Sequence, residues 1–309
     1  MSDSQPLVSI VILSYYWTRY LQEVLESLVG QSYPHLEILL VNNKGPESDQ
    51  VRRIAAEFPS IRLIQNEANL GFTGGMNVGV RAAKGHYVYM TEEDVVVRRD
   101  CIAALVDFMN GHPDVGLAAP IMYNKREGTI RSAGGRFSLG SIYTMKILGE
   151  GQADVGQFRE PFDVTYIPGA SIFARSDELK GMNGFREDFF MYVEDAELCM
   201  RLLKSGRRIV TVPAAKVDHF EPPVGKPSDV IDFLRLKNFY ALYLLHAPAR
   251  ALPGFLYRYS ARTLAMGLIR DRRQVKLMLK AWGWVIVRLP RLLAERDRRP
   301  FPARVGLGD

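Results

Sequence analysis

Cysteine and long apolar runs are scarce in this chain, and each scarcity excludes a class of protein. Only two of the 309 residues are cysteines, Cys101 and Cys199, and neither belongs to a Cys-x-x-Cys or Cys/His zinc pattern. A disulfide scaffold is therefore excluded, and a reducing compartment is expected. The longest unbroken apolar run, residues 239–245, has seven residues, whereas a membrane-spanning helix needs ~20. We therefore expect that the protein does not cross a bilayer.

The composition is that of a globular protein rather than of a disordered one. Apolar residues make up 47% of the chain and charged residues 24%, and both values lie near globular averages. No basic segment precedes the first apolar stretch, Val8–Leu13, so we expect no secretory signal. A chain of 309 residues is long enough for one large α/β domain or two ordinary domains.

Positive charge is concentrated at the C-terminal end. Residues 250–309 contain 14 Lys or Arg and 4 Asp or Glu, a net charge of +10, whereas residues 1–249 carry a net charge of −4. Basic residues such as Arg258, Arg270 and Lys280 alternate there with apolar residues and precede Trp282 and Trp284. This pattern is typical of a helix that lies in the headgroup region of an anionic membrane. The alternative is that these helices pack on the rest of the protein.

Strand-like and helix-like patterns alternate over the first 120 residues. Val8–Leu13 is a β-branched apolar run, and the apolar spacing after Thr18 predicts a helix that ends near Gly30. Further strands are expected at Leu36–Val41, Ile61–Ile64, His86–Met90 and Val115–Ala119, with helices at Gln50–Phe58, up to Ala83 and at Cys101–Asn110. We therefore predict an α/β fold in which a mainly parallel, Rossmann-like sheet lies between helices.

The second half of the chain is less regular. Residues 122–164 predict a loop or hairpin excursion, followed by a strand at Val164–Ala174 and a helix at Glu194–Leu203. Short strands are expected at Ile209–Val212 and Lys216–His219. Pro222, Pro223 and Pro227 mark a linker. We therefore expect a domain at residues 1–225 and a basic amphipathic helical extension at residues 226–309.

Three carboxylates follow one of the predicted strands. Ligands of parallel sheets gather at the carboxyl ends of strands, and Glu92, Glu93 and Asp94 lie at such an end with no basic neighbour. Clustered carboxylates repel one another unless a cation lies among them, and Mg²⁺ prefers carboxylate oxygens. The alternative is a solvated acidic turn.

Two further positions carry groups suited to catalysis. Glu194 and Asp195 follow the aromatic stretch Phe189–Val193, and nearby apolar groups can raise the pKa of a carboxylate to suit a general base. A helix start rich in acidic residues is the alternative. His219 follows a short strand and could ligate a metal together with the acidic turn, or it could be a packing residue.

A glycine-rich segment offers backbone amides to phosphate. Gly71, Gly74, Gly75 and Gly79 lie at the start of a predicted helix, where amides can approach phosphate oxygens. Their spacing matches neither Gly-x-Gly-x-x-Gly nor the P-loop pattern, so neither a dinucleotide site nor a P-loop is indicated.

Taken in order, these segments resemble the family 2 inverting glycosyltransferases with a GT-A fold, and most closely their rhamnosyltransferase-like branch. The resemblance covers about residues 7–220 and is most specific at Asn69–Asn77 and Phe189–Asp195. It implies a nucleotide-diphosphate sugar as donor, most simply dTDP-rhamnose or a UDP-sugar. The implied acceptor is a hydroxyl of a saccharide or lipid-linked glycan.

The resemblance also implies roles for individual residues. Asp195 matches the general base, and Asp94 and His219 match ligands of a Mg²⁺ or Mn²⁺ ion that binds the diphosphate. The donor is expected to lie against residues from four segments. These are Tyr15 and Asn42 at the nucleobase, Asn69, Gly71 and Asn77 at the ribose and diphosphate, and Glu92 and Glu93 in the acidic turn. Asn42 stands where relatives commonly have Asp, so its amide oxygen would have to accept the base N–H without a charge.

Three alternatives to an active transferase remain open from the sequence. A nucleotidyltransferase would share the sheet and the acidic cluster, but Ser14–Trp17 has neither the Gly nor the Lys of its phosphate loop. A non-catalytic nucleic-acid- or glycan-binding protein would use the basic tail, although the acidic clusters argue against nucleic acid. A transferase fold that has lost activity is the third. For the active enzyme we expect a cytoplasmic location, peripheral on the inner face of the cell membrane.

Overall fold

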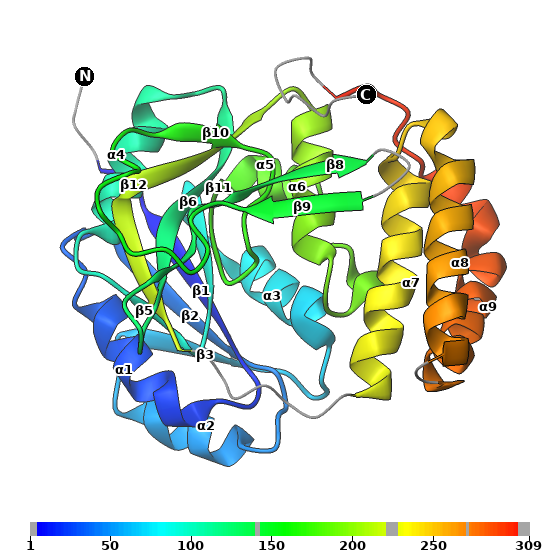
Figure 1. Ribbon diagram of the computed structural model, residues 1–309. Coiled ribbons are helices and arrows are strands. Elements are labelled where there is room, and N and C mark those ends of the chain that lie inside the picture. The colour runs from blue at the N-terminus through cyan, green and yellow to red at the C-terminus, as the bar shows by residue number, and fades with distance from the viewer. Residues whose placement is uncertain (1–4, 140–142, 221–227, 270–271, 302–309) are drawn as a thin grey trace.

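One large sheet forms the centre of the protein. The computed structural model describes residues 5–139, 143–220, 228–269 and 272–301. Ten strands form this sheet, with the spatial order β10-β12-β6-β11-β4-β1-β2-β3 and with β5 and β7 paired to β12 and β6 (Figure 1). The strands in chain order are β1 (Val8–Ser14), β2 (Leu36–Asn42), β3 (Ile61–Gln65), β4 (Tyr87–Glu92), β5 (Val95–Val97), β6 (Val115–Asn124), β7 (Ile130–Ser132), β10 (Phe162–Val164), β11 (Ser171–Arg175) and β12 (Arg208–His219).

The N-terminal half of the sheet is parallel. β1 pairs with both β2 and β4, and β2 pairs with β3, all in parallel. The connecting helices are α1 (Thr18–Val29), α2 (Ser48–Ala56) and α3 (Gly71–Ala82), followed by α4 (Cys101–Gly111) before β6. Apolar residues recur every three to four positions in α1, and those residues are buried against the sheet. The predicted alternation of strands and helices in this half is confirmed.

The second half of the sheet differs from the prediction in two places. The single strand expected at Val164–Ala174 is wrong, because residues 165–170 lie outside the named strands. Val164 ends β10, which pairs with β12, and β11 begins at Ser171 and pairs in antiparallel fashion with β4 and β6. The two short strands expected at Ile209–Val212 and Lys216–His219 are one strand, β12. Its pairing with β6 shifts register between Val212 and Lys216, in the stretch where Pro213 lacks a backbone N–H.

The expected excursion at residues 122–164 contains a hairpin. β8 (Gly135–Leu139) and β9 (Tyr143–Ile147) form a separate two-stranded antiparallel sheet. Two short helices complete the body before β12: α5 (Ser176–Gly181) and α6 (Glu194–Lys204). The helix predicted at Glu194–Leu203 is therefore confirmed.

The C-terminal extension consists of α7 (Asp229–His246), α8 (Leu252–Ile269) and α9 (Arg272–Ala294). Figure 1 shows these three helices side by side along one flank of the molecule, with α7 next to α6. Leu236, Tyr240 and Tyr243 of α7 belong to the same buried cluster as Leu198 and Leu202 of α6. The apolar core therefore runs without a break from the sheet into the extension. Pro222, Pro223 and Pro227, read as a linker, lie outside the described residues, and the division at residue 225 stays a prediction.

Candidate active site

A cavity of about 860 Å³ lies at the carboxyl ends of the parallel strands β1 and β4. Its walls come from the loops after these two strands, the segment before α3, the segment leading into α6, and α7. Acidic residues from two distant parts of the chain face it, Glu92–Asp94 after β4 and Glu194–Asp195 at the start of α6. The fold thus brings the two acidic groups found in the sequence to one cavity.

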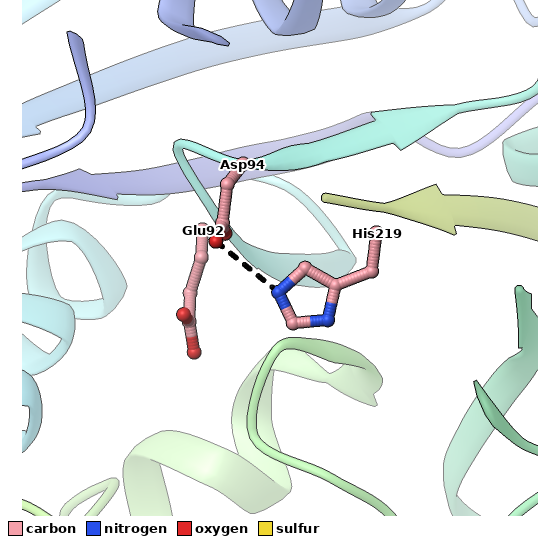
Figure 2. Close-up of side chains that lie close together, drawn as sticks. All are labelled: Glu92, Asp94 and His219. Atoms are coloured by element: carbon pink, nitrogen blue, oxygen red, sulfur yellow. Dashed lines mark ion pairs between the residues drawn. The ribbon is translucent and has the colours of Figure 1, made fainter. Parts of the chain in front are cut away.

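Glu92, Asp94 and His219 form a cluster on one side of this cavity (Figure 2). A ligand atom from each residue lies within 4.8 Å of the other two. His219 reaches the acidic turn because β12 pairs with β5, which places His219 opposite Val95, the residue after Asp94. The Nε2 atom of His219 lies 3.3 Å from Oδ2 of Asp94.

The chemistry of this cluster fits a divalent cation. Two of its buried atoms, Asp94 Oδ1 and His219 Nδ1, have no hydrogen-bond partner in the described part of the chain. Burial, followed by the charges of Asp94, Glu93 and Asp195, raises the pKa of Glu92 to about 8. Two carboxylates and an imidazole suit Mn²⁺ or Mg²⁺, and a cation among them would remove the repulsion.

Asp195 is held in a defined orientation at the start of α6. Its Oδ2 atom accepts hydrogen bonds from the Tyr166 hydroxyl at 2.6 Å and the Gly169 amide at 3.2 Å. Its Oδ1 atom accepts from the Ala196 amide at 2.7 Å. Burial raises the pKa of Asp195, and these hydrogen bonds oppose the rise. The carboxylate therefore remains available as a proton acceptor whose basicity exceeds that of an ordinary aspartate.

The neighbouring carboxyl group of Glu194 has a different environment from that of Asp195. Its side chain is buried, and its Oε2 atom lacks a hydrogen-bond partner among the described residues. Burial, followed by the charge of Asp195, raises the pKa of Glu194 well above its usual range. The hydrogen bonds that oppose the rise at Asp195 are lacking at Oε2 of Glu194 among the described residues, so the environments of the two carboxyl groups differ and Asp195 is the better candidate for the base.

Glu93 holds the loop that follows β1. Its Oε1 atom accepts hydrogen bonds from the backbone amides of Tyr15, Tyr16 and Trp17 at 2.7–2.8 Å, and its Oε2 atom accepts from the Ser14 hydroxyl. Burial raises the pKa of Glu93, and these four hydrogen bonds oppose the rise. Glu93 was expected beside the donor, and it also fixes the loop that carries Tyr15.

Glu93→Ala is expected to lower the free energy of unfolding by about 2–4 kcal/mol, because it leaves three amides and a hydroxyl without their acceptor. Glu93→Gln should cost about 1 kcal/mol, since the amide oxygen can accept from the three N–H groups and the Ser14 hydroxyl can accept from the amide nitrogen. Urea unfolding of both variants measures the difference. Wild-type stability of Glu93→Ala would show that this carboxylate does not support the loop.

Five of the seven predicted donor-binding residues line the cavity, and two do not. Tyr15, Asn69, Gly71, Glu92 and Glu93 line the cavity. The lining does not include the remaining two. Asn42 is buried, and its amide bonds Ser48 and Gln65, while Asn77 bonds Phe185 and Glu187. The nucleobase role of Asn42 stays a prediction.

The sequence reading missed three residues that shape the site. Asn43 lines the cavity and donates to Asn69 Oδ1 at 3.1 Å and to the Gly71 carbonyl at 2.9 Å. Its position directly after β2, where ligands gather, was the available signal. Tyr166 and Gly169, which bind Asp195, lie in a segment that the sequence presented as a strand.

Comparison with solved structures identifies the fold. The chain aligns with GalNAc-T7 bound to UDP, GalNAc and Mn²⁺, with a TM-score of 0.67, 14% identity, and 97% of this chain and 59% of that chain covered. It aligns with a mannosyltransferase from Pyrobaculum calidifontis bound to GDP-Man and Mn²⁺, with a TM-score of 0.56, 18% identity and coverages of 99% and 82%. It aligns with Staphylococcus aureus TarS 1–349 bound to UDP-GlcNAc, with a TM-score of 0.61, 18% identity and coverages of 94% and 83%. The fold is that of GT-A glycosyltransferases.

Comparison of the sequence with protein families identifies the family of this chain. Residues 9–174 match glycosyl transferase family 2, and the chain belongs to this family. The predicted GT-A fold and family are thus confirmed. This membership decides against the nucleotidyltransferase and the nucleic-acid-binding protein.

Relatives with assigned names include two rhamnosyltransferases. The N-acetylglucosaminyl-diphospho-decaprenol L-rhamnosyltransferase of Mycobacterium tuberculosis is 27% identical over 246 residues, which are 71% of this chain and 76% of that protein. Rhamnosyltransferase WbbL of Escherichia coli is 22% identical over 224 residues, with coverages of 69% and 83%. An uncharacterized glycosyltransferase of Haemophilus influenzae is 24% identical over 66% of this chain, and the match spans 62% of its length, less than two thirds.

Proposed function

We propose that the protein is a metal-dependent, inverting glycosyltransferase that moves a sugar from a nucleotide-diphosphate sugar to a hydroxyl of a saccharide or lipid-linked glycan. One observation carries this proposal. The Glu92–Asp94–His219 cluster and the oriented carboxylate of Asp195 line the same cavity. A group that binds diphosphate and a general base are the two parts that a single displacement at an anomeric carbon needs.

Asp195 is the proton acceptor in this reaction. An acceptor hydroxyl attacks the anomeric carbon from the face opposite the nucleotide, so a C–O bond to the acceptor forms as the bond to the diphosphate oxygen breaks. The hydroxyl proton passes to a carboxylate oxygen of Asp195, and the nucleoside diphosphate departs with the bonding electron pair. A single displacement inverts the anomeric configuration. The hydrogen bonds from Tyr166 and Gly169 keep Asp195 oriented before the acceptor arrives.

The leaving diphosphate is stabilised from two sides. Gly71 and Phe72, the first residues of α3, line the cavity, and a helix N-terminus attracts negative charge. Glu92, Asp94 and His219 are the residues that would hold a divalent cation, and such a cation, when bound, neutralises charge that develops on the diphosphate.

A panel of donors tests this function. Release of nucleoside diphosphate should be measured with UDP-, dTDP- and GDP-sugars, each with and without a mixture of saccharide and lipid-linked acceptors. The names of the two rhamnosyltransferase relatives favour a rhamnosyl donor. Our first candidate is therefore dTDP-rhamnose, the donor that the family resemblance implies, and a UDP-sugar is the next. Acceptor-dependent turnover of one nucleotide sugar supports the proposal, and failure to bind or turn over any of them contradicts it.

The surface of the C-terminal extension bears on where the enzyme would meet a lipid-linked acceptor. No helix in the described ranges is long and apolar enough to span a membrane. Trp282 and Trp284 pack partly buried against clusters that contain α7 residues, rather than standing free. Other apolar side chains on α8 and α9 are exposed, namely Tyr257, Leu279, Ile286 and Val287. We propose that these exposed side chains, with the neighbouring basic residues, hold the enzyme on an anionic membrane. Arg270, which belongs to the basic pattern of the sequence, lies outside the described residues.

Flotation with anionic vesicles checks this attachment. The full chain should float at low salt and dissociate as salt rises, because each basic residue near an anionic leaflet contributes ~1 kcal/mol that salt screens. The double variant Ile286→Ser, Val287→Ser removes exposed apolar side chains and should bind at least about tenfold more weakly. Equal flotation of the wild-type protein and this variant would exclude these side chains from the contact.

A further inference from the structure

The segment leading into α6 has a strained backbone. Phe190, Tyr192 and Val193 have φ angles of 65°, 70° and 71°, which residues with a Cβ rarely adopt. Such a conformation is strained, and it persists only where the surroundings impose it. Val193 is the N-cap residue of α6, two positions before Asp195. The strain therefore lies in the segment that sets the direction in which the base enters the cavity.

Asn238 of α7 binds the carbonyls of this segment. Its Nδ2 atom lies 3.0 Å from the carbonyl oxygen of Phe189, 2.9 Å from that of Met191 and 2.7 Å from that of Tyr192. The Asn238 side chain is fully buried. An amide nitrogen has only two hydrogens, so the three carbonyls share them and converge on a single atom. The geometry of the segment and the place of Asn238 therefore depend on each other.

Lys237 supports the same contact from the adjacent position. Its Nζ atom donates to the Asp188 carbonyl at 2.8 Å and to Asn238 Oδ1 at 2.6 Å. Only 3% of the side chain is exposed, and burial lowers the pKa of Lys237 to about 8. A buried ammonium is costly unless its hydrogens find acceptors. Here the acceptors are the Asp188 carbonyl just before the strained segment, the Phe189 carbonyl at its start and the side chain of Asn238, which binds the segment.

The opposite side of the segment contacts the start of α3. The Thr73 amide donates to the Phe190 carbonyl at 3.2 Å. A Cβ on Gly71 would lie 2.6 Å from a ring carbon of Phe190, so a side chain larger than glycine would displace the segment. The segment is thus enclosed between α3, which borders the donor side of the cavity, and α7.

We propose that Lys237 and Asn238 are positioning residues for the transfer reaction: from the C-terminal extension, they hold Phe189–Val193 in the strained conformation that directs Asp195 at the acceptor hydroxyl. The inference rests on the proposed function, in which Asp195 is the base. In this proposal α7 helps to position the catalytic base, in addition to any role of the C-terminal extension at a membrane. A displacement of the base by ~1 Å is enough to cost ~10²-fold in rate.

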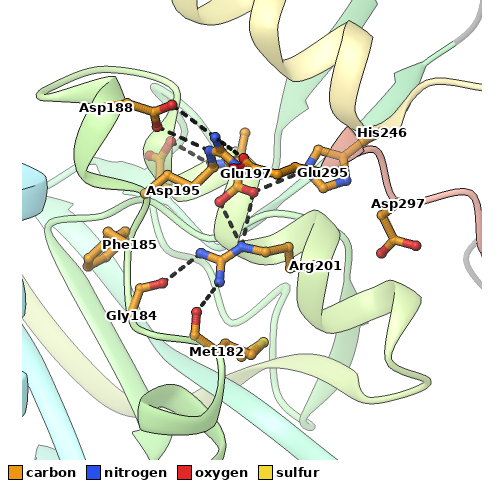
Figure 3. Close-up of polar contacts among 12 residues, drawn as sticks. Met182, Gly184, Phe185, Asp188, Asp195, Glu197, Arg201, His246, Glu295 and Asp297 are labelled. Carbon is orange, nitrogen blue, oxygen red and sulfur yellow. Dashed lines mark hydrogen bonds and ion pairs between the residues drawn. The ribbon is translucent and has the colours of Figure 1, made fainter. Parts of the chain in front are cut away.

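A second buried lysine provides a matched control. Lys204, near the C-terminal end of α6, donates to the carbonyls of His246 and Asp297 at 2.9 and 2.6 Å. Like Lys237, it has a pKa lowered to about 8 by burial. Its hydrogen bonds to backbone carbonyls link α6 to the C-terminal extension. Figure 3 shows Glu197 and Arg201 of α6 between the base and this end of the helix. Lys204→Met therefore removes comparable bonds without touching the segment before Asp195.

The test compares Asn238→Asp, Lys237→Met and Lys204→Met in the full chain. Asn238→Asp keeps the side-chain shape but places an oxygen against three carbonyls, and Lys237→Met provides an independent variant if the first does not fold. We expect kcat to fall by about 10–100-fold in the first two, with the donor dissociation constant within about threefold of wild type. Lys204→Met should shift the urea midpoint by a similar amount but keep kcat within about threefold.

Hydrogen exchange gives a readout that does not depend on turnover. Amides of residues 190–196 should exchange at least about tenfold faster in Asn238→Asp and Lys237→Met than in the wild-type protein, and not in Lys204→Met. Wild-type kcat and unchanged exchange in the first two variants would overturn the proposal. Absence of transfer in the wild-type protein, with accelerated exchange in the variants, would instead overturn the proposed function and leave the structural role of Lys237 and Asn238 intact.

Discussion

Asp195→Asn is expected to lower kcat by ~10²–10⁴-fold, because the amide cannot take the proton of the acceptor hydroxyl. Donor binding should change little, since the proposed nucleotide site lies against other walls of the cavity, where Tyr15, Asn69 and the acidic turn are lining residues. Steady-state turnover and calorimetric donor titration measure the two quantities separately. In the wild-type enzyme, kcat/KM should fall on the acid side with an apparent pKa above that of an ordinary aspartate, because burial raises the pKa of Asp195.

Glu194→Gln is the matched control for this prediction. Burial holds the pKa of Glu194 well above its usual range, and glutamine keeps the size of this side chain while removing its ability to take up or release a proton. Its kcat should fall by less than about tenfold. If Asp195→Asn turned over at the wild-type rate, or if Glu194→Gln alone abolished transfer, Asp195 would not be the base.

Asp94→Ala is expected to lower kcat by about 10³-fold, because a cation on the diphosphate contributes several kcal/mol to transition-state stabilisation. Excess EDTA should lower wild-type turnover by a similar factor, and Mn²⁺ or Mg²⁺ should restore it. The metal should also raise the melting temperature of the wild-type protein, since a ligand that binds only the folded state stabilises it.

Glu93→Gln separates the metal effect from the loop effect. Glu93 is outside the three-residue cluster and binds the loop after β1. This variant should therefore keep the metal-induced rise in melting temperature, whereas Asp94→Ala should lose it. Full wild-type activity in excess EDTA would contradict a metal-dependent reaction.

The local features of this fold could be predicted from the sequence, and the long-range ones could not. The apolar periodicity after Thr18 and the β-branched run at Val8–Leu13 depend on neighbouring residues, and both predicted elements form. β11 and β12 depend on partners far along the chain. The single strand β12 persists through Pro213 because β6 pairs with it on both sides of the register shift, which no local pattern reveals.

The residues of the site could likewise be predicted from the sequence only where the signal was local. Glu92 and Asp94 could be found because they follow a predicted strand without a basic neighbour, and Asp195 because it follows the aromatic stretch Phe189–Val193. Which of two adjacent asparagines lines the cavity could not be found. Side chains alternate in direction along a strand, and a one-residue difference separates Asn43, in the lining, from Asn42, which bonds Ser48 and Gln65. The contact of Asn238 with the segment before α6 likewise requires the packing of α7.

The anomeric configuration of the product tests the central claim most directly. The donor selected from the panel should be turned over with its acceptor, and the new glycosidic linkage should be analysed by proton NMR before any side reaction accumulates. A single displacement assisted by Asp195 predicts a product with the opposite anomeric configuration to the donor, formed only with Mn²⁺ or Mg²⁺ present. A product that retains the donor's configuration would contradict the single displacement, and with it the role of Asp195 as the base.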